Sequence, residues 1–295
     1  MSDPMGSISI SMIDELWNFH DAAESEARFH HALPTAALGS EFYVELLTQI
    51  ARAQGLQRNF AAAHATLDEA ARLLAPPHKR AAVRLLLERG RVFNSAGEPS
   101  RAHPLFVQAW EEAQAAGEEA LAVDAAHMVA IVLPPEEQLA WNLRALALAE
   151  NATDPRARKW IVSLHNNIGW TYHALGQNEQ ALASLAKTVE WHEAAGRTIE
   201  RRIAHWSVAR ILRALGRMEE ALAIQQQLAR EWEESGASDG YVDEELGECL
   251  LALGRGDEAA SHFSRAHTLL SADPWLVANE PERLERLRAL GQVTR

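Results

Sequence analysis

Residues 174–181 read ALGQNEQA, residues 214–221 read ALGRMEEA, and residues 252–259 read ALGRGDEA. A weaker copy, SAGEPSRA, ends at Ala102. Followed along the whole chain, the final alanine recurs at steps of 38–41 residues, at Ala63, Ala102, Ala140, Ala181, Ala221 and Ala259. Self-similarity at a fixed period of this size is the signature of a repeat architecture. The sequence therefore predicts a stacked array of similar units.

Three further positions repeat with the alanine. A turn glycine precedes it by five residues, which suits the left-handed residue that ends a helix. A small residue precedes that glycine by seven, and a large apolar residue follows the alanine by four. The small residues are Gly90, Gly169, Ala209 and Gly247; the large ones are Leu67, Phe106, Leu185 and Phe263, with Gln225 in copy five; a second small residue follows at Ala70, Ala109, Ala147 and Ala266. We expect two helices that cross closely in each unit, with the small residues at the crossing.

This pattern resembles the tetratricopeptide repeat, a family whose units are pairs of antiparallel helices. Copy four matches best, at Leu164, Ile168, Gly169, Tyr172, Gly176, Ala181 and Leu185. Copy one has Arg58 at the turn glycine, and copy three has Pro134 and Pro135 in its turn. The family repeats every 34 residues, so the step of about 39 indicates the bacterial type with longer repeats. The resemblance implies an all-α, right-handed α-solenoid of six helix-turn-helix repeats with half-repeat caps at both ends.

The predicted organisation is a single solenoid domain over residues 13–291, preceded by a loose leader over residues 1–12. Its parts are a half-repeat at 16–33, repeats at about 40–75, 79–116, 118–150, 157–195, 198–235 and 239–271, and a C-terminal capping helix at about 280–291. In the first half-repeat Ser25 takes the alanine place, Phe29 the large place and Ala32 the second small place. The last helix begins at Pro281 and should turn its leucines inward.

Composition narrows the possible partners. The formal net charge is −13, from 28 basic and 41 acidic residues, which disfavours nucleic acid and anionic membranes because both require a basic surface. Cys249 is the only cysteine, so no disulfide can form within the chain and no thiolate metal cluster is expected. No apolar run approaches the length of a membrane span, and the N-terminus lacks the basic region of a signal peptide. We expect a cytoplasmic protein.

In the family, the first helix of each repeat lines a concave groove, and its second, fifth, ninth and twelfth positions face it, counting the first small residue as eighth. In copy three these positions are Ala122, Ala125, Val129 and Val132. The other copies supply residue types common in binding hot spots, namely arginine and aromatic side chains, together with asparagine, which both donates and accepts hydrogen bonds. The predicted groove residues are Arg52, Arg84, Arg91, Asn94, Asn166, Trp170, His173, Trp206, Arg210, Arg213 and Tyr241.

Motifs for catalysis are weak, so we predict neither an enzyme nor a cofactor. None of the 13 histidines has the i, i+4 spacing with an intervening glutamate of a helical zinc site. Two functions remain. The chain could be a scaffold or adaptor that holds a protein or peptide partner, with an acidic or carboxylate-ended segment suited to the arginines. Alternatively, it could be a ligand- or peptide-responsive regulator without an effector domain of its own.

Overall fold

The structure is a computed structural model that describes residues 12–292, and every regular element within that range is a helix. The all-α prediction is therefore confirmed for the described chain. The chain divides into two compact units, Met1–Leu164 and His165–Arg295, and each is described below by itself. The predicted leader at residues 1–12 lies outside the described residues except for Met12, which is helical together with residues 13–16.

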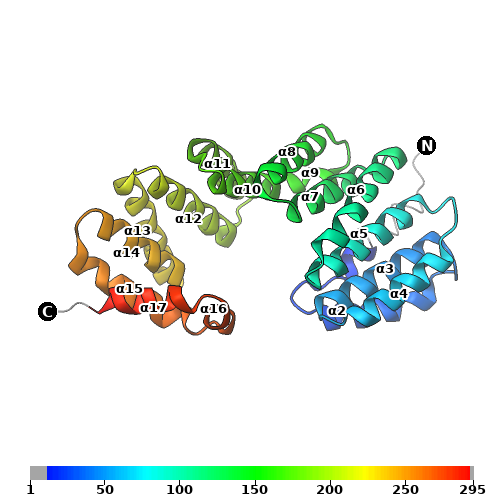
Figure 1. Cartoon of the computed structure of the whole chain (residues 1–295), viewed down its shortest axis with the longest axis horizontal. Helices are drawn as coiled ribbons and strands as arrows, with labels where there is room; N and C mark the ends of the chain where they lie inside the picture. The colour runs from blue at the N-terminus through cyan, green and yellow to red at the C-terminus, as the bar shows by residue number, and fades with distance from the viewer. Residues whose placement is uncertain (1–11, 293–295) are drawn as a thin grey trace. The chain divides into compact units, whose positions relative to one another are not determined.

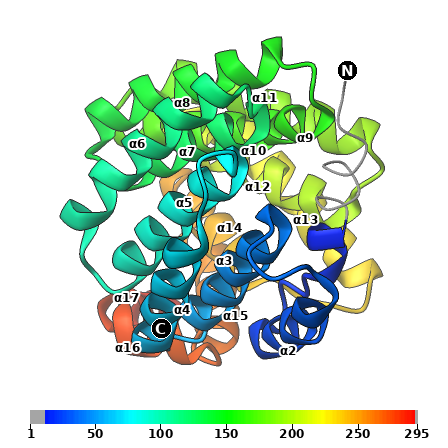
Figure 2. The ribbon, with the colours of Figure 1, turned by 90° about the vertical axis from the view of Figure 1, so that its right-hand side faces the viewer.

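Unit 1 contains three helical hairpins, α3/α4, α5/α6 and α7/α8 (Figure 1). Helix α2 packs on α3, α3 packs on α5, and α6 packs on α7, so consecutive hairpins stack side by side (Figure 2). The elements are α2 (Ala22–Ala32), the 3-10 turn η1 (Leu33–Thr35), α3 (Glu41–Leu56), α4 (Phe60–Leu73), α5 (Lys79–Ser95), α6 (Pro99–Ala116), α7 (Glu119–Ile131), α8 (Pro135–Asn151) and α9 (Pro155–Arg158).

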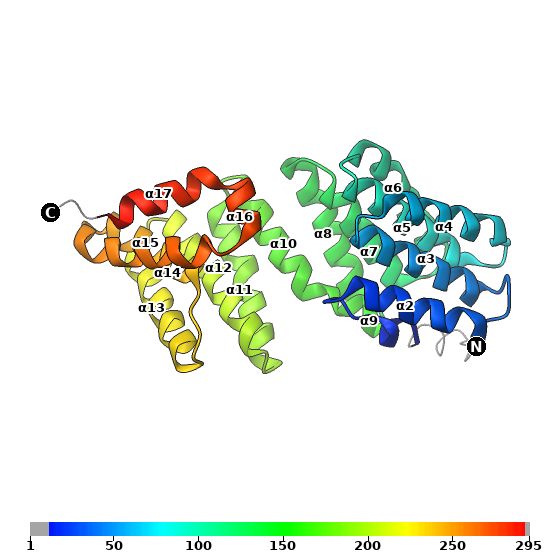
Figure 3. The same cartoon turned by 90° about the horizontal axis from the view of Figure 1, so that it is seen from below.

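Unit 2 begins inside helix α10 and contains the hairpins α12/α13 and α14/α15, with α11 completing the hairpin of α10. Helix α17 packs along α15 at the C-terminal end (Figure 3). The elements are α10 (Trp160–Ala174), α11 (Asn178–Ala194), α12 (Thr198–Ala214), α13 (Met218–Glu234), α14 (Gly240–Ala252), α15 (Gly256–Leu270), α16 (Pro274–Asn279) and α17 (Pro281–Gly291).

The predicted small and large residues meet at the helix crossings. A Cβ atom added to Gly169 would lie 2.5 Å from Leu185 Cγ and 3.3 Å from the backbone oxygen of Ala181. At Gly247 it would lie 2.7 Å from the ring of Phe263. Backbones that approach this closely leave no room for a side chain, because protein interiors are densely packed. The crossing prediction is confirmed for these copies.

The turn between the two helices uses a left-handed residue. Gly97, Gly176, Gly216 and Gly254 have φ between 72° and 83°. Copy one keeps the same turn although it carries Arg58 there, whose φ is 62°. A side chain makes this conformation unfavourable, so copy one holds a strained residue where the other copies have glycine.

Copy three has a different register from the predicted one. In the other five hairpins the alanine is the fourth residue of the second helix, and there it is buried. Helix α8 begins at Pro135, because proline favours the first position of a helix, and its fourth residue is Gln138. Ala140 and Ala147 are exposed, whereas Asn142, Ala145 and Ala149 are buried. The prediction was wrong by two residues.

The shift changes the first helix of copy three as well. Ala125 and Val129 are fully buried, so their assignment to a groove surface was wrong. With the corrected register the ninth position belongs to His127, and the sixth belongs to Asp124. Burial lowers the pKa of His127, and its ring lies 5.1 Å from the ring of Trp160.

The C-terminal capping helix agrees with the sequence prediction, whereas the N-terminal half-repeat is shorter than predicted. Ser25, Phe29 and Ala32 are buried on α2 as expected, but the helix starts only at Ala22, because the Asp21 side chain accepts a hydrogen bond from the Glu24 backbone and caps it there. Helix α17 spans the residues for which a helix was predicted, and its Leu287 is fully buried.

None of the helices in the described range has the length and apolarity that crossing a membrane requires.

Candidate binding surface

Three aromatic side chains form a continuous row on the first helices of unit 2. Trp170 comes from α10, Trp206 from α12 and Tyr241 from α14. The ring centroids of Trp170 and Trp206 are 6.1 Å apart, and those of Trp206 and Tyr241 are 6.2 Å apart. The Trp206 indole nitrogen also donates a hydrogen bond of 3.2 Å to the backbone oxygen of Tyr241. We call these three residues the aromatic row.

The row extends at both ends. The ring of His173 lies 5.8 Å from Trp170, and His173 Nδ1 is 2.7 Å from Asn178 Oδ1. At the other end the Arg283 guanidinium lies 5.3 Å from the centroid of the Tyr241 ring. Arginine over an aromatic face is a favourable electrostatic contact, so the row is held in place from both sides.

A pocket of about 370 Å³ opens beside the aromatic row. Its lining is chiefly apolar, and Ile203 and Tyr241 stay 54 % and 37 % exposed. Arg202 does not fill it, because its guanidinium stacks 4.5 Å over the Trp232 ring and donates to the backbone oxygen of Glu231. The lining residues of this aromatic pocket are Arg202, Ile203, Trp206, Trp232, Asp239, Tyr241 and Val242.

The arginines predicted to recognise a ligand carboxylate in unit 2 already bind one within the chain. Arg210 Nη1 and Arg213 Nε both donate to Glu245, the latter at 2.7 Å, and the Glu245 side chain is only 2 % exposed. Burial opposes the charge of Arg213, but its hydrogen bonds to Glu245 raise its pKa overall. These two side chains are therefore part of the packing between α12 and α14, contrary to the expectation that they are free.

Unit 1 holds a similar set of ion pairs. Arg91 donates to Glu88 at 2.6 Å and to both carboxylate oxygens of Asp124 at 2.5 and 2.7 Å. The single nitrogen Nη2 of Arg91 donates to both oxygens of Asp124, and such charge-assisted hydrogen bonds are stronger than those between neutral groups. Arg84 Nε lies 3.6 Å from Glu45, a fully buried carboxylate.

These pairs follow the repeat, which the sequence analysis missed. An arginine at the ninth position of one copy lies against an acidic residue at the sixth position of the next. The pairs are Arg52 with Glu88, Arg91 with Asp124 and Arg210 with Glu245. The sequence contains a pattern that indicates these pairs. Each acidic residue stands two places before the first small residue of its own copy. In copy three this holds only in the corrected register.

The eleven predicted groove residues fall into both units. Arg52, Arg84, Arg91 and Asn94 belong to unit 1, and the other seven belong to unit 2. Within unit 2, Asn166, Trp170 and His173 are spaced by four and three residues on α10, which places them on one helix face. Asn166 Nδ2 lies 3.5 Å from Asn167 Oδ1. That all eleven share one groove stays a prediction.

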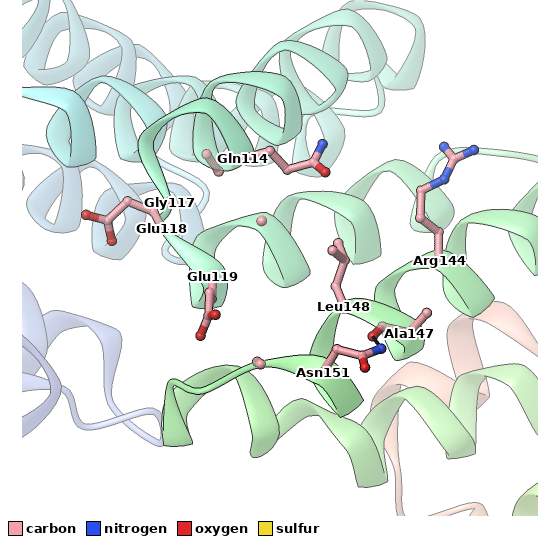
Figure 4. Close-up of a pocket in the computed structure, with 11 residues that line it drawn as sticks. Gln114, Gly117, Glu118, Glu119, Arg144, Ala147, Leu148 and Asn151 are labelled. Carbon is pink, nitrogen blue, oxygen red and sulfur yellow. Dashed lines mark hydrogen bonds between the residues drawn. The ribbon is translucent and has the colours of Figure 1, made fainter.

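A second pocket, of about 490 Å³, lies between α6, α7 and α8 in unit 1 (Figure 4). Small side chains such as Ala113, Ala122 and Ala147 line much of it. Two of its charged groups have partners elsewhere. Glu119 accepts hydrogen bonds from the backbone nitrogens of Thr153 and Asp154. The Arg144 guanidinium lies 4.3 Å from the Trp141 ring. No predicted site residue lines this pocket.

Within residues 12–292, no three histidine, cysteine, aspartate or glutamate side chains are grouped so that they could hold a metal ion. Burial raises the pKa of the Cys249 thiol to about 11. A thiol with a raised pKa is a poor nucleophile at neutral pH, so Cys249 serves as a small buried residue.

Two family models match the second half of the chain. Residues 162–193 match a model described as tetratricopeptide repeat, and residues 192–268 match a second one described as tetratrico peptide repeat. No curated protein matches the sequence.

Solved structures share the fold at low sequence identity. A signal transduction ATPase with numerous domains and a tetratricopeptide repeat sensor, from Pyrococcus horikoshii, has a TM-score of 0.72 at 13 % identity, covering 95 % of this chain. This chain spans only 43 % of that protein. The apo form of RapI has a TM-score of 0.75 at 12 % identity, over 96 % of this chain and 79 % of RapI. The apo quorum sensor NprR from B. thuringiensis has a TM-score of 0.64 at 15 % identity, over 97 % and 82 %.

Proposed function

We propose that this chain, a tetratricopeptide repeat protein, is a non-catalytic binding protein that holds a peptide or an extended segment of a partner protein. The anchor is a bulky apolar side chain of the partner, which enters the aromatic pocket beside Trp206 and Tyr241. The observation that carries the proposal is the aromatic row, which runs over three successive first helices and borders an open pocket.

The chemistry of the row suits this role. Tryptophan and tyrosine are enriched in interface hot spots because they bury a large area with few rotatable bonds. A pocket of about 370 Å³ lies near the lower end of the usual range for ligand sites, about 300–1,000 Å³. It has room for one or two side chains, and the rest of a peptide would lie along the row.

The row also offers polar groups for orientation. The Asn166 amide lies on the same face of α10 as Trp170 and can bond a peptide backbone. Arg210 and Arg213 both pair with Glu245, and the negative charge of Glu248 also acts on Arg213. An acidic residue or a terminal carboxylate of the partner can bond these arginines in competition with the two acids.

The likeness to peptide-binding proteins supports the proposal. NprR has been solved in complex with its cognate peptide NprX, and that structure has a TM-score of 0.55 at 13 % identity over 98 % of this chain and 84 % of NprR. A Rap protein has been solved in complex with the competence and sporulation factor. Both structures are of proteins with a similar fold that bind a partner molecule, whereas the proposal for this chain rests on its own aromatic row.

The test is selection from a displayed library of random peptides, followed by affinity measurement with Trp206→Ala. Truncating a hot-spot residue costs about 2–4 kcal/mol, which is roughly thirtyfold or more in Kd. The matched control is Trp275→Ala, because Trp275 is 60 % exposed on α16 and does not line the pocket. We expect peptides enriched in bulky apolar residues, a large loss with Trp206→Ala, and wild-type binding with the control.

Two results would reject the proposal. One is a selected peptide that binds folded Trp206→Ala as tightly as the wild type. The other is a library in which no peptide is enriched over repeated rounds. Melting curves of both variants show whether a loss of binding comes from a loss of fold.

A further inference from the structure

A small polar pocket lies in unit 1, separate from the aromatic pocket of unit 2. Its volume is about 170 Å³, and it lies among helices α3, α5 and α7. The polar side chains at its wall are Arg52, Arg91, Asn94 and Ser95, and the remaining wall includes Val92 and Met128. Two guanidinium groups therefore face one cavity, and their like charges repel each other unless an anion compensates them.

Among these polar side chains, Arg52 is the one whose charged N–H groups have no hydrogen-bond acceptor in the described part of the protein. Its closest carboxylate oxygen belongs to Glu88, at 3.7 Å, and its guanidinium lies 5.3 Å from the Trp17 ring centroid. Within residues 12–292 Arg52 donates no side-chain hydrogen bond, although its side chain is only 30 % exposed. A guanidinium carries five N–H donors, and those of Arg52 are left without a protein acceptor.

The hydrogen bonds of the neighbouring carboxylates go to Arg91, although Glu88 Oε2 is buried without a hydrogen-bond partner among the described residues. Glu88 accepts from Arg91 at 2.6 Å, and both oxygens of Asp124 accept from the same guanidinium. Burial, together with the positive charge of Arg91, lowers the pKa of Arg52. Arg52 is thus a partly buried cation whose nearest acid, Glu88, pairs with it at 3.7 Å without a hydrogen bond, so its N–H donors can bond a further acceptor.

Asn94 adds a second unused donor. Its side-chain amide makes no hydrogen bond among the described residues, and it lies one helical turn after Arg91 on α5. A polar group that lines a cavity without a partner is expected to bond water or a ligand. The volume of the pocket corresponds to several water molecules, each of which occupies about 30 Å³ in the liquid.

We propose that this pocket binds a small oxyanion, a carboxylate or phosphate group, between Arg52 and Asn94. The planar fork of arginine matches the two oxygens of such a group, and a hydrogen bond of this kind gains strength from both charges. The amide of Asn94 donates to a further oxygen, and Arg91 contributes positive charge without moving from Asp124. The pocket is too small for a folded partner, so the ligand is a free small anion or one charged group of a larger molecule. The proposal does not rest on the proposed peptide role, because it is argued from residues of unit 1 alone.

The test uses inorganic phosphate and acetate as separate probes, titrated at constant ionic strength and followed by calorimetry and by the melting temperature. The variants are Arg52→Gln and Asn94→Ala. The matched control is Arg72→Gln, because Arg72 is an exposed arginine of α4 in the same unit. Constant ionic strength separates binding from general screening of charges.

We expect saturable binding of at least one probe by the wild type, weakened at least tenfold by Arg52→Gln, several-fold by Asn94→Ala, and less than twofold by Arg72→Gln. Tighter binding of phosphate assigns a phosphorylated ligand, and tighter binding of acetate assigns a carboxylate. Where Arg52→Gln fails to fold, Arg52→Lys replaces it, since lysine keeps the charge and loses the fork. The proposal is overturned if neither probe saturates, or if folded Arg52 and Asn94 variants bind as the wild type does.

Discussion

Replacing Gln225 by methionine should stabilise the protein. Gln225 occupies the large position of copy five, where copies one, two, four and six have leucine or phenylalanine. Its side chain is fully buried, and neither its amide nitrogen nor its amide oxygen has a hydrogen-bond partner among the described residues. A buried polar group without a partner costs about 1–3 kcal/mol. Methionine has a similar length, no polar amide to desolvate, and good helix propensity.

The expected gain is about 1–3 kcal/mol in the free energy of unfolding of unit 2. Methionine is preferable to leucine here, because copy five has Ala209 at the crossing where copy four has Gly169, and a branched side chain would be more crowded. The assays are urea denaturation and hydrogen exchange of α12 and α13. Hydrogen exchange is needed because repeat proteins can unfold in parts, so a single transition is not guaranteed.

The control is Gln226→Met, one residue further along α13. Gln226 is exposed, so its substitution should change stability by no more than about 0.5 kcal/mol in either direction. If Gln225→Met is less stable than the wild type while Gln226→Met is neutral, the Gln225 amide has a stabilising partner, and the reasoning from its burial is refuted.

Three further variants test the fold. Arg58→Gly should stabilise copy one by up to about 1 kcal/mol, because it relieves a left-handed residue; a lower melting temperature would contradict this. Gly169→Ala should destabilise by about 1–3 kcal/mol despite the better helix propensity of alanine, because the new Cβ would lie 2.5 Å from Leu185 Cγ. Gly256→Ala, which meets no atom within 4 Å, is its control in urea denaturation. Arg210→Glu combined with Arg213→Glu should lower stability by about 3–5 kcal/mol, because it leaves buried Glu245 without a cation; an unchanged melting temperature would show that these ion pairs carry no structural role.

The fold was predictable because packing positions repeat. Each copy of the pattern repeats the same packing requirement. The copies that match the pattern well were therefore enough to predict the helix crossing at Gly169 and the capping helix that begins at Pro281. The prediction failed at copy three because Pro134–Pro135 replaces the turn that sets the register. A proline at the first helical position determines where the helix begins, so the apparent alignment of Ala140 with the other alanines was a coincidence.

The candidate site was less predictable from the sequence. Helical spacing indicates which side chains share a helix face, but it does not indicate which residues of a neighbouring helix they contact. The predicted groove face contained Trp170, Trp206 and Tyr241, and their rings lie next to one another although they stand at the ninth, fifth and second positions of their copies. The spacing could not tell that Arg210 is held by Glu245. Each copy was treated separately, whereas the ion pairs join one copy to the next.

The ion pairs also explain why an acidic protein places arginines along its first helices. Each hairpin exposes a helix face to the next hairpin, and an apolar face alone would allow the copies to slide by one helical turn. An arginine paired with a buried carboxylate of the next copy opposes such a slip, because a shifted register would leave Glu245 or Asp124 buried without its cation, at a cost of several kcal/mol. Arg52 stands at the same repeat position, but its partner Glu88 is already bonded to Arg91. The periodic role therefore accounts for Arg91 and Arg210 and leaves Arg52 with spare donors, which is the physical reason to look for a ligand there and not at the other two arginines.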